Sequence, residues 1–231
     1  MTRRIVLDPD SSSREPERLE FFSDAVIAIA ITLLVIEIHV PDQAEIASNG
    51  DLWHALGALW PSYLGYAITF LGIGIMWVNH HRMFRYLVRV DRYLILINTF
   101  FLLCIAFVPF VTGLLAGFLG QPGERTAIVV YTGWFVVTGV IVDLLWRYPY
   151  HWRPALLAPD ADRAEMATYT RMLDIGTPAQ LVALVFAFIA PVVSLLIVAG
   201  LAVLYALPWS IETDDASEVP TEGTGETARS G

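Results

Sequence analysis

Long apolar segments separated by short polar ones run through most of this 231-residue chain. A helix needs about 20 apolar residues to cross roughly 30 Å of hydrocarbon, and several segments reach that length. The pattern predicts membrane-spanning helices near residues 19–40, 53–78, 92–118 and 126–146, followed by a final apolar stretch at 176–209. The fold class expected from this pattern is an all-α membrane protein.

The final stretch is too long for one ordinary span, and Pro191 falls near its middle. Because proline removes a helix hydrogen bond and clashes with the preceding turn, it breaks or kinks a helix. Two spans joined by a tight turn at Ala190-Pro191 give six transmembrane helices in total. One long kinked helix, which would give five, is the alternative.

The arginines alternate between the two sides of this predicted topology. From the N-terminal lead-in to the C-terminal tail, the successive connecting segments contain four, none, four, one, four, none and one Arg. Segments rich in Arg and Lys stay on the cytoplasmic side of a membrane. The alternation therefore predicts a multi-pass protein of the cell membrane with both its N-terminus and its C-terminus in the cytoplasm.

The composition supports a membrane protein and excludes other classes. The chain is 56% hydrophobic and 16% charged, with a mean hydropathy of +0.58. Its net charge of −9 comes largely from the acidic segment 210–231. The sequence contains no basic stripe of the kind that binds nucleic acid. The single Cys104 cannot form a disulfide within one chain. We expect a disordered cytoplasmic lead-in at 1–17, a membrane domain at 18–209 and a disordered cytoplasmic tail at 210–231.

The first span carries most of the functional information. It opens with Arg18, Ser23 and Asp24, and polar groups in a membrane helix are costly unless something binds them. On a helical wheel one stripe is apolar apart from a single hydroxyl, that of Thr32, and Asp24 points to nearly the opposite side. The stripe consists of Phe22, Ala25, Ile29, Thr32, Leu33, Ile36 and Val40.

Two residues of this span leave questions that the pattern does not decide. Asp24 needs a buried partner, and we expect it to face Arg18, Arg82 or a His of a neighbouring helix. Thr32 either serves a function on the stripe or is a packing hydroxyl bonded to its own i−4 carbonyl.

A second polar cluster, Trp77, His80, His81 and Arg82, ends the second span. Adjacent His residues project about 100° apart on a helix, and no residues at i, i+4 complete a metal site. We therefore expect an interfacial hydrogen-bonding cluster without a metal. No set of acids, bases or metal ligands meets at one depth, so we expect no enzyme activity and no cofactor.

Arg18-x-x-x-Phe22-Ser23-Asp24 ahead of an Ala/Ile/Thr/Leu helix resembles the signature of the endosomal and lysosomal potassium channel family named transmembrane protein 175. Trp77-x-x-His80-His81-Arg82 resembles that family's second recurring segment. Animal members contain two six-span repeats, whereas this chain looks like a short prokaryotic member with one.

The resemblance implies a potassium-preferring cation channel in which four copies place their first helix around a central pore. It implies that Ile29 forms an aliphatic constriction continued by Leu33 and Ile36, and that a ring of Thr32 favours potassium, with the permeating ion near Ile29 and Thr32. It assigns a structural role, away from the ions, to Arg18, Phe22, Ser23, Asp24, Trp77, His80, His81 and Arg82.

The expected partners are potassium and other monovalent cations, the lipid bilayer and further copies of the chain. The chain contains no TVGYG-like filter, so selectivity by rings of backbone carbonyls is not expected. Glu37 and Asp42 near the outer mouth either concentrate cations or are solvated loop carboxylates. The alternative function is a secondary transporter of small solutes or ions, which usually shows repeats or helices broken at the membrane midplane.

Overall fold

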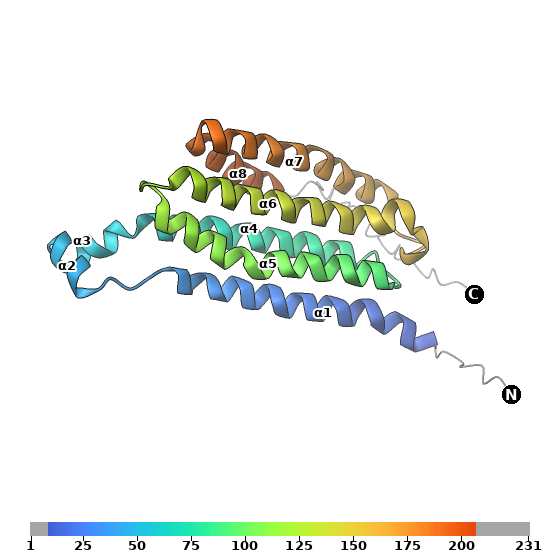
Figure 1. Cartoon of the computed structure of the whole chain (residues 1–231). Helices are drawn as coiled ribbons and strands as arrows, with labels where there is room; N and C mark the ends of the chain where they lie inside the picture. Colours follow the sequence, from blue (N-terminus) through green and yellow to red (C-terminus); the bar gives the residue numbers. More distant parts are fainter. Residues whose placement is uncertain (1–8, 207–231) are drawn as a thin grey trace, which may run out of the picture.

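The computed structural model describes residues 9–206 as a bundle of long antiparallel helices (Figure 1). Among the described residues, five helices are long and apolar enough to cross a membrane, and a shorter apolar helix follows them. The five are α1 (Pro9–Leu33), α4 (Trp60–Phe84), α5 (Arg92–Phe118), α6 (Glu124–Arg147) and α7 (Arg163–Ile189); the shorter helix is α8 (Pro191–Ala206).

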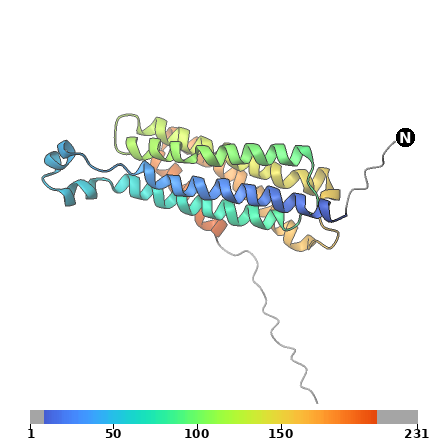
Figure 2. The same cartoon turned by 90° about the horizontal axis from the view of Figure 1, so that it is seen from below.

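Short helices fill the connections. A 3-10 turn η1 (Leu34–Glu37) continues α1, and the helices α2 (Gln43–Asn49) and α3 (Leu52–Ala58) extend beyond one end of the bundle (Figures 1 and 2). At the opposite end, a π-helical turn η2 (Tyr148–Trp152) and a 3-10 turn η3 (Pro154–Leu156) connect α6 to α7.

Local capping residues set several helix ends. The Asp91 carboxylate accepts hydrogen bonds from the backbone N–H groups of Tyr93 and Leu94 and so begins α5. Asp162 does the same for α7. Side-chain oxygens at such positions satisfy N–H groups that a helix leaves without partners.

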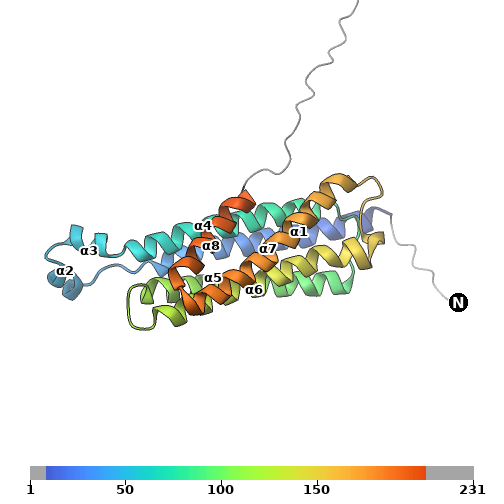
Figure 3. The same cartoon turned by 90° about the horizontal axis from the view of Figure 1, so that it is seen from above.

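The break predicted at Pro191 is present. α7 ends at Ile189, and the C-cap residue Ala190 has φ −140° and ψ 82°; α8 starts with Pro191 and packs back along α7 (Figure 3). Proline suits the first position of a helix because its missing N–H has no intrahelical partner there. The alternative of one long kinked helix is therefore wrong. At 16 residues, α8 is about 24 Å long and so shorter than the hydrocarbon thickness.

Three predicted boundaries differ from the structure. The second span is not 53–78, because α3 and α4 are separate helices and α4 runs from Trp60 to Phe84, with Pro61 in its first turn. The fifth long helix begins at Arg163 instead of near residue 176, because Asp162 caps it there. Residues 9–17 of the predicted lead-in are helical, as the start of α1. Residues 1–8 and the predicted tail 210–231 lie outside the described residues.

The buried side chains form two clusters along the bundle. The larger one includes Ile27 and Ala30 of α1 and Leu34 of η1 together with residues of α4, α5 and α6. The second lies toward the end where η2 and η3 are found, and includes Phe84, Leu94 and Trp146. α1 packs on α4 and α5 and lies across the bundle from α7 (Figures 1 and 2). One side of α1 is therefore left uncovered within the single chain.

Candidate functional site

α1 has one fully packed face and one open face. Ser23 and Ile27 of α1, and Leu34 at the start of η1, are 0–1% exposed and point into the bundle. The exposed fractions of Ile29 and Leu33 on the other face are 59% and 42%. The wheel drawn from the sequence separates the same two faces, and Ala25, Ala28 and Thr32 are also exposed.

The open face does not continue as a regular α-helix to Val40. The α-helical part ends at Leu33, and Ile36 lies in the tighter turn η1, where it is 70% exposed. Val40 lies beyond Glu37, the last residue of η1, and is not part of a helical stripe. The prediction of one straight stripe from Phe22 to Val40 is therefore wrong beyond Leu33, because a 3-10 turn rotates 120° per residue instead of 100°.

Thr32 differs from the interpretation of a packing hydroxyl bonded to the i−4 carbonyl. Its hydroxyl donates a 2.8 Å hydrogen bond to the carbonyl of Ile29, at i−3 and not the expected i−4. The side chain is nevertheless exposed on the open face, so it does not pack between helices. With the proton committed to the backbone, the lone pairs of Thr32 Oγ1 remain free to accept.

A buried hydrogen-bonded chain lies behind the packed face and joins three helices. Ser23 of α1 donates to the carbonyl of Leu19 at 2.8 Å and accepts from Nδ2 of Asn98 in α5 at 2.8 Å. Oδ1 of Asn98 accepts from Nε2 of His80 in α4 at 2.9 Å. All three side chains are 0–3% exposed. The His80 ring also stacks on Phe84 and Phe101, with centroids 4.3 and 5.2 Å away.

Two further contacts tie α1 to α4. Trp77 Nε1 donates to the Asp24 carboxylate at 2.9 Å, and Nδ1 of His81 lies 2.7 Å from Oε1 of Glu20. Asp24 thus faces α4, as expected, but its hydrogen-bond partner is Trp77 and not an Arg or a His. An indole N–H satisfies a carboxylate without bringing a second charge into the apolar environment.

The remaining residues of the predicted network are not part of these contacts. Arg18 is exposed, and neither it nor Arg82 forms an ion pair with any of the described residues. Phe22 is 57% exposed on the same side as Ile29. The structure instead adds Asn98 and Glu20, which the sequence reasoning missed. The available signal was that Asn98 is a lone amide inside the apolar segment 92–118.

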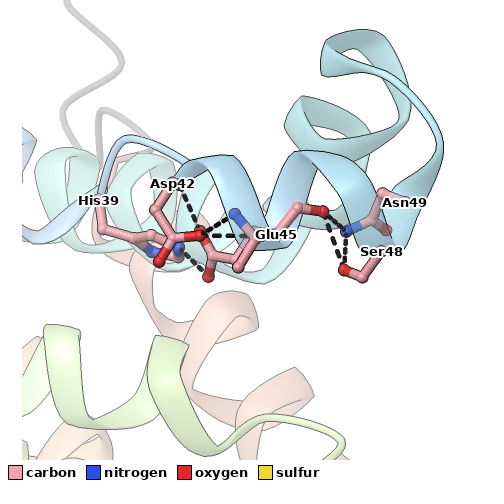
Figure 4. A network of polar contacts seen from close by, with 6 residues as sticks. His39, Asp42, Glu45, Ser48 and Asn49 are labelled. Atoms are coloured by element: carbon pink, nitrogen blue, oxygen red, sulfur yellow. Dashed lines mark hydrogen bonds and ion pairs between the residues drawn. The ribbon is translucent and has the colours of Figure 1, made fainter.

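The carboxylates that the sequence analysis placed near an outer mouth have local contacts. Asp42 accepts from the N–H groups of Ala44 and Glu45 and caps α2, while Glu45 accepts from the Asp42 N–H and lies 3.2 Å from His39 (Figure 4). The Glu37 carboxylate lies directly against Gly113 of α5, in space that a Cβ would fill. Asp42 therefore caps a helix, and the Glu37 carboxylate faces α5.

Metal coordination finds no support in the part of the chain that the structure describes. Within residues 9–206, no three His, Cys, Asp or Glu side chains come together as a possible metal site.

Comparison with known proteins gives a consistent family. The profile of the endosomal/lysosomal potassium channel TMEM175 matches residues 18–109. A protein of Chamaesiphon minutus named as a potassium channel is 42% identical over 203 residues, covering 88% of this chain and 98% of that protein. A potassium channel of Streptomyces collinus is 43% identical over 57% of this chain and 63% of its own length.

Vertebrate and structural relatives agree with this result. The endosomal/lysosomal proton channel TMEM175 of Gallus gallus is 44% identical over 30% of this chain and 15% of its own length. The crystal structure of a lysosomal potassium-selective channel TMEM175 homolog from Chamaesiphon minutus superposes with a TM-score of 0.76 at 38% identity, covering 83% of this chain and 96% of that chain. The match to the Chamaesiphon minutus potassium channel exceeds 40% identity and covers most of both chains. This chain therefore belongs to the TMEM175 family of potassium channels.

Proposed function

We propose that this protein is a potassium-preferring cation channel of the cell membrane, built from four copies that place the open face of α1 around a central pore. The proposal rests on the exposure of this face. Ile29 and Leu33 of α1 and Ile36 of the turn η1 are 42–70% exposed, whereas the opposite side of α1 is packed. The named bacterial relatives are potassium channels. Both termini are proposed to be cytoplasmic, on the distribution of Arg.

In this proposal, Ile29 forms the narrowest apolar ring, and Leu33 and Ile36 continue it. A ring of aliphatic side chains controls permeation by excluding water, because an ion cannot enter without its hydration shell or a substitute. The Thr32 hydroxyl, directed by its bond to the Ile29 carbonyl, supplies oxygen lone pairs next to that ring. Four hydroxyls replace only part of an ion's hydration, so we expect a modest preference for potassium with some sodium flux.

The network behind α1 has a positioning role in this proposal. The hydrogen bonds of Ser23 with Asn98 and of Asp24 with Trp77 fix how α1 is rotated against α4 and α5. The rotation decides which side chains face the axis, since neighbouring residues lie 100° apart on a helix.

The test is ion flux into liposomes that contain the full chain under a potassium gradient. Ile29→Asn should raise the potassium flux about tenfold, as expected for a barrier lowered by roughly 1.4 kcal/mol. Thr32→Ala should reduce the preference of potassium over sodium. The matched control is Leu103→Asn on α5, because Leu103 and Ile29 are both 59% exposed. If Leu103→Asn changes flux as much as Ile29→Asn, α1 does not line the pore.

The same vesicles separate a channel from a transporter. Stepwise single-channel currents support the channel, whereas gradient-coupled uptake without such steps supports the secondary transporter. Because the vertebrate relatives are named proton channels, proton flux is recorded alongside with a pH-sensitive dye.

The arrangement of copies is tested by cross-linking. Ile29→Cys in a Cys104→Ala background leaves one thiol per chain, and oxidation should join pairs of subunits if the four α1 helices meet on an axis. Leu103→Cys in the same background should remain monomeric on a denaturing gel. Cross-linking at Leu103 and not at Ile29 would overturn the assignment.

A further inference from the structure

Two connecting segments are fixed to each other at the end of the bundle that the Arg pattern places in the cytoplasm. The N–H of Val88 donates to the carbonyl of Leu156 at 2.9 Å, and the N–H of Ala158 donates to the carbonyl of Tyr86 at 2.8 Å. These bonds flank an antiparallel bridge between Leu87 and Leu157, whose side chains are buried in the second cluster. The segment before α5 and the segment after η2 therefore form one rigid surface.

Arginine and aromatic side chains adjoin one another on this surface. The Arg92 guanidinium lies 5.6 Å from the ring centroid of Tyr93. The ring centroids of Tyr93 and Tyr148 are 6.5 Å apart, and those of Tyr148 and Trp152 are 6.4 Å apart. Tyr93 and Trp152 are 55% and 60% exposed. Together with Arg153, these residues form what we call the arginine–aromatic patch.

The patch lies where two membrane spans end. Arg92 is the first residue of one span and Trp152 the last residue of another. Tyr and Trp collect at the headgroup level of a bilayer, because one part of the ring is apolar and the other forms hydrogen bonds. The exposed rings of the patch are thus placed for contact with lipid near its headgroups.

Positive charge in the patch exceeds negative charge. Asp91, the acidic group beside it, already accepts from the N–H groups of Tyr93 and Leu94 and from the Tyr148 hydroxyl at 2.7 Å. The Arg153 guanidinium is 3.6 Å from Asp91 with its side chain 52% exposed, and Arg92 forms no ion pair with the described residues. Most guanidinium N–H donors of these two arginines therefore remain available.

We propose that the arginine–aromatic patch binds the phosphate headgroup of an anionic phospholipid, with Arg92 and Arg153 contacting the phosphate and Tyr93 and Trp152 contacting the glycerol and upper acyl region. Guanidinium groups match phosphate oxygens in paired hydrogen bonds. The site is separate from the α1 face, so the proposal does not depend on where ions pass.

The test measures lipid binding to the full chain in detergent by native mass spectrometry, with short-chain phosphatidylglycerol and phosphatidylcholine as the two probes. An Arg near an anionic lipid surface contributes about fivefold in affinity, so Arg92→Gln with Arg153→Gln should weaken phosphatidylglycerol binding about 30-fold. Phosphatidylcholine should bind weakly to both proteins. Arg92→Lys with Arg153→Lys should retain only part of the affinity, because Lys cannot form the paired hydrogen bonds.

Arg163→Gln with Arg171→Gln is the matched control, since both arginines are exposed on α7 and the charge change is the same. The proposal is overturned if this control weakens binding as much, or if phosphatidylcholine binds the unmodified protein as tightly as phosphatidylglycerol. It is also overturned if millimolar inorganic phosphate displaces the lipid, because the site would then be one for free phosphate. Thermal unfolding of each variant identifies loss of binding caused by misfolding. If the Gln variant is misfolded, the affinity of the Arg92→Lys, Arg153→Lys variant tests the proposal.

Discussion

Removing Asn98 should loosen the junction of α1, α4 and α5 while leaving the exposed face of α1 chemically unchanged. Asn98 is 0% exposed and forms two interhelical hydrogen bonds, to Ser23 at 2.8 Å and from His80 at 2.9 Å. Asn98→Ala deletes both and leaves the His80 N–H without its acceptor, between the rings of Phe84 and Phe101.

Two free-energy costs determine the expected destabilisation. An interhelical hydrogen bond in a membrane contributes about 0.6 kcal/mol on average and up to about 1.7 kcal/mol. A buried donor left without a partner costs roughly 1–3 kcal/mol. The cost at Asn98 should lie at the upper end of these ranges. The side chains of Ser23, His80 and Asn98 are all buried, and two aromatic rings flank the His80 imidazole. We expect Asn98→Ala to lower the free energy of unfolding by about 2–3 kcal/mol.

The measurement is reversible unfolding in mixed detergent micelles, compared with Thr99→Ala. Thr99 is the next residue on α5, is exposed, and bonds only to the carbonyl of Ile95 in its own helix, so its loss should cost less than about 0.5 kcal/mol. Replacing Asn98 by Leu together with His80 by Phe should recover part of the loss, because neither polar group is then left unpaired. Equal destabilisation by Asn98→Ala and Thr99→Ala would refute the reasoning.

Two further predictions concern packing and pH. Gly176→Ala places a methyl group into the phenol ring of Tyr205, so we expect a loss of about 1–3 kcal/mol in unfolding free energy, whereas the Cβ of Gly133→Ala meets its nearest neighbour at 3.7 Å and should be tolerated. Burial alone would raise the pKa of Asp91, but hydrogen bonds from Leu94 and Tyr148 and the Arg153 charge hold it below 3.8. The stabilisation that the ionised Asp91 gives the folded protein is therefore complete above pH 3.8. It is lost as the pH falls through the lower pKa that Asp91 has in the folded state. At pH 7 the free energy of unfolding of Asp91→Asn should be lower than that of the unmodified protein. At the lowest pH at which the protein stays folded, the two free energies should be nearly equal. A difference that does not change with pH would contradict this.

The boundaries of the helices show where sequence patterns stop being informative. The segment 92–118 was predicted from its apolar run with the bounds that α5 has, and the structure shows Asp91 capping its first turn. α7 was predicted to begin near residue 176, since residues 163–175 are polar enough to be read as a loop. Burial of one side of that segment, at Met166, Tyr169 and Leu173, adds it to the helix.

The partners of the polar residues show the same limit at the candidate site. The periodicity of α1 separated Asp24 from Ile29 and Thr32, because rotation per residue is a local property. It did not identify Trp77 as the partner of Asp24, although both residues had been selected. Contacts 53 residues apart in the chain depend on how α1 and α4 pack, which local patterns do not encode.

By itself, the sequence determined that this is a helical membrane protein, where most of its apolar helices lie, and that one face of the first helix is apolar with a single hydroxyl. These properties follow from apolar length and helical period, which are fixed residue by residue. Only the tertiary structure decided that this face is left open, that Asn98 joins Ser23 to His80, and that Trp77 is the partner of Asp24. Those features depend on which helices become neighbours, and in a bilayer that choice rests on close packing and a few polar contacts between distant segments, because lipid covers any apolar surface equally well.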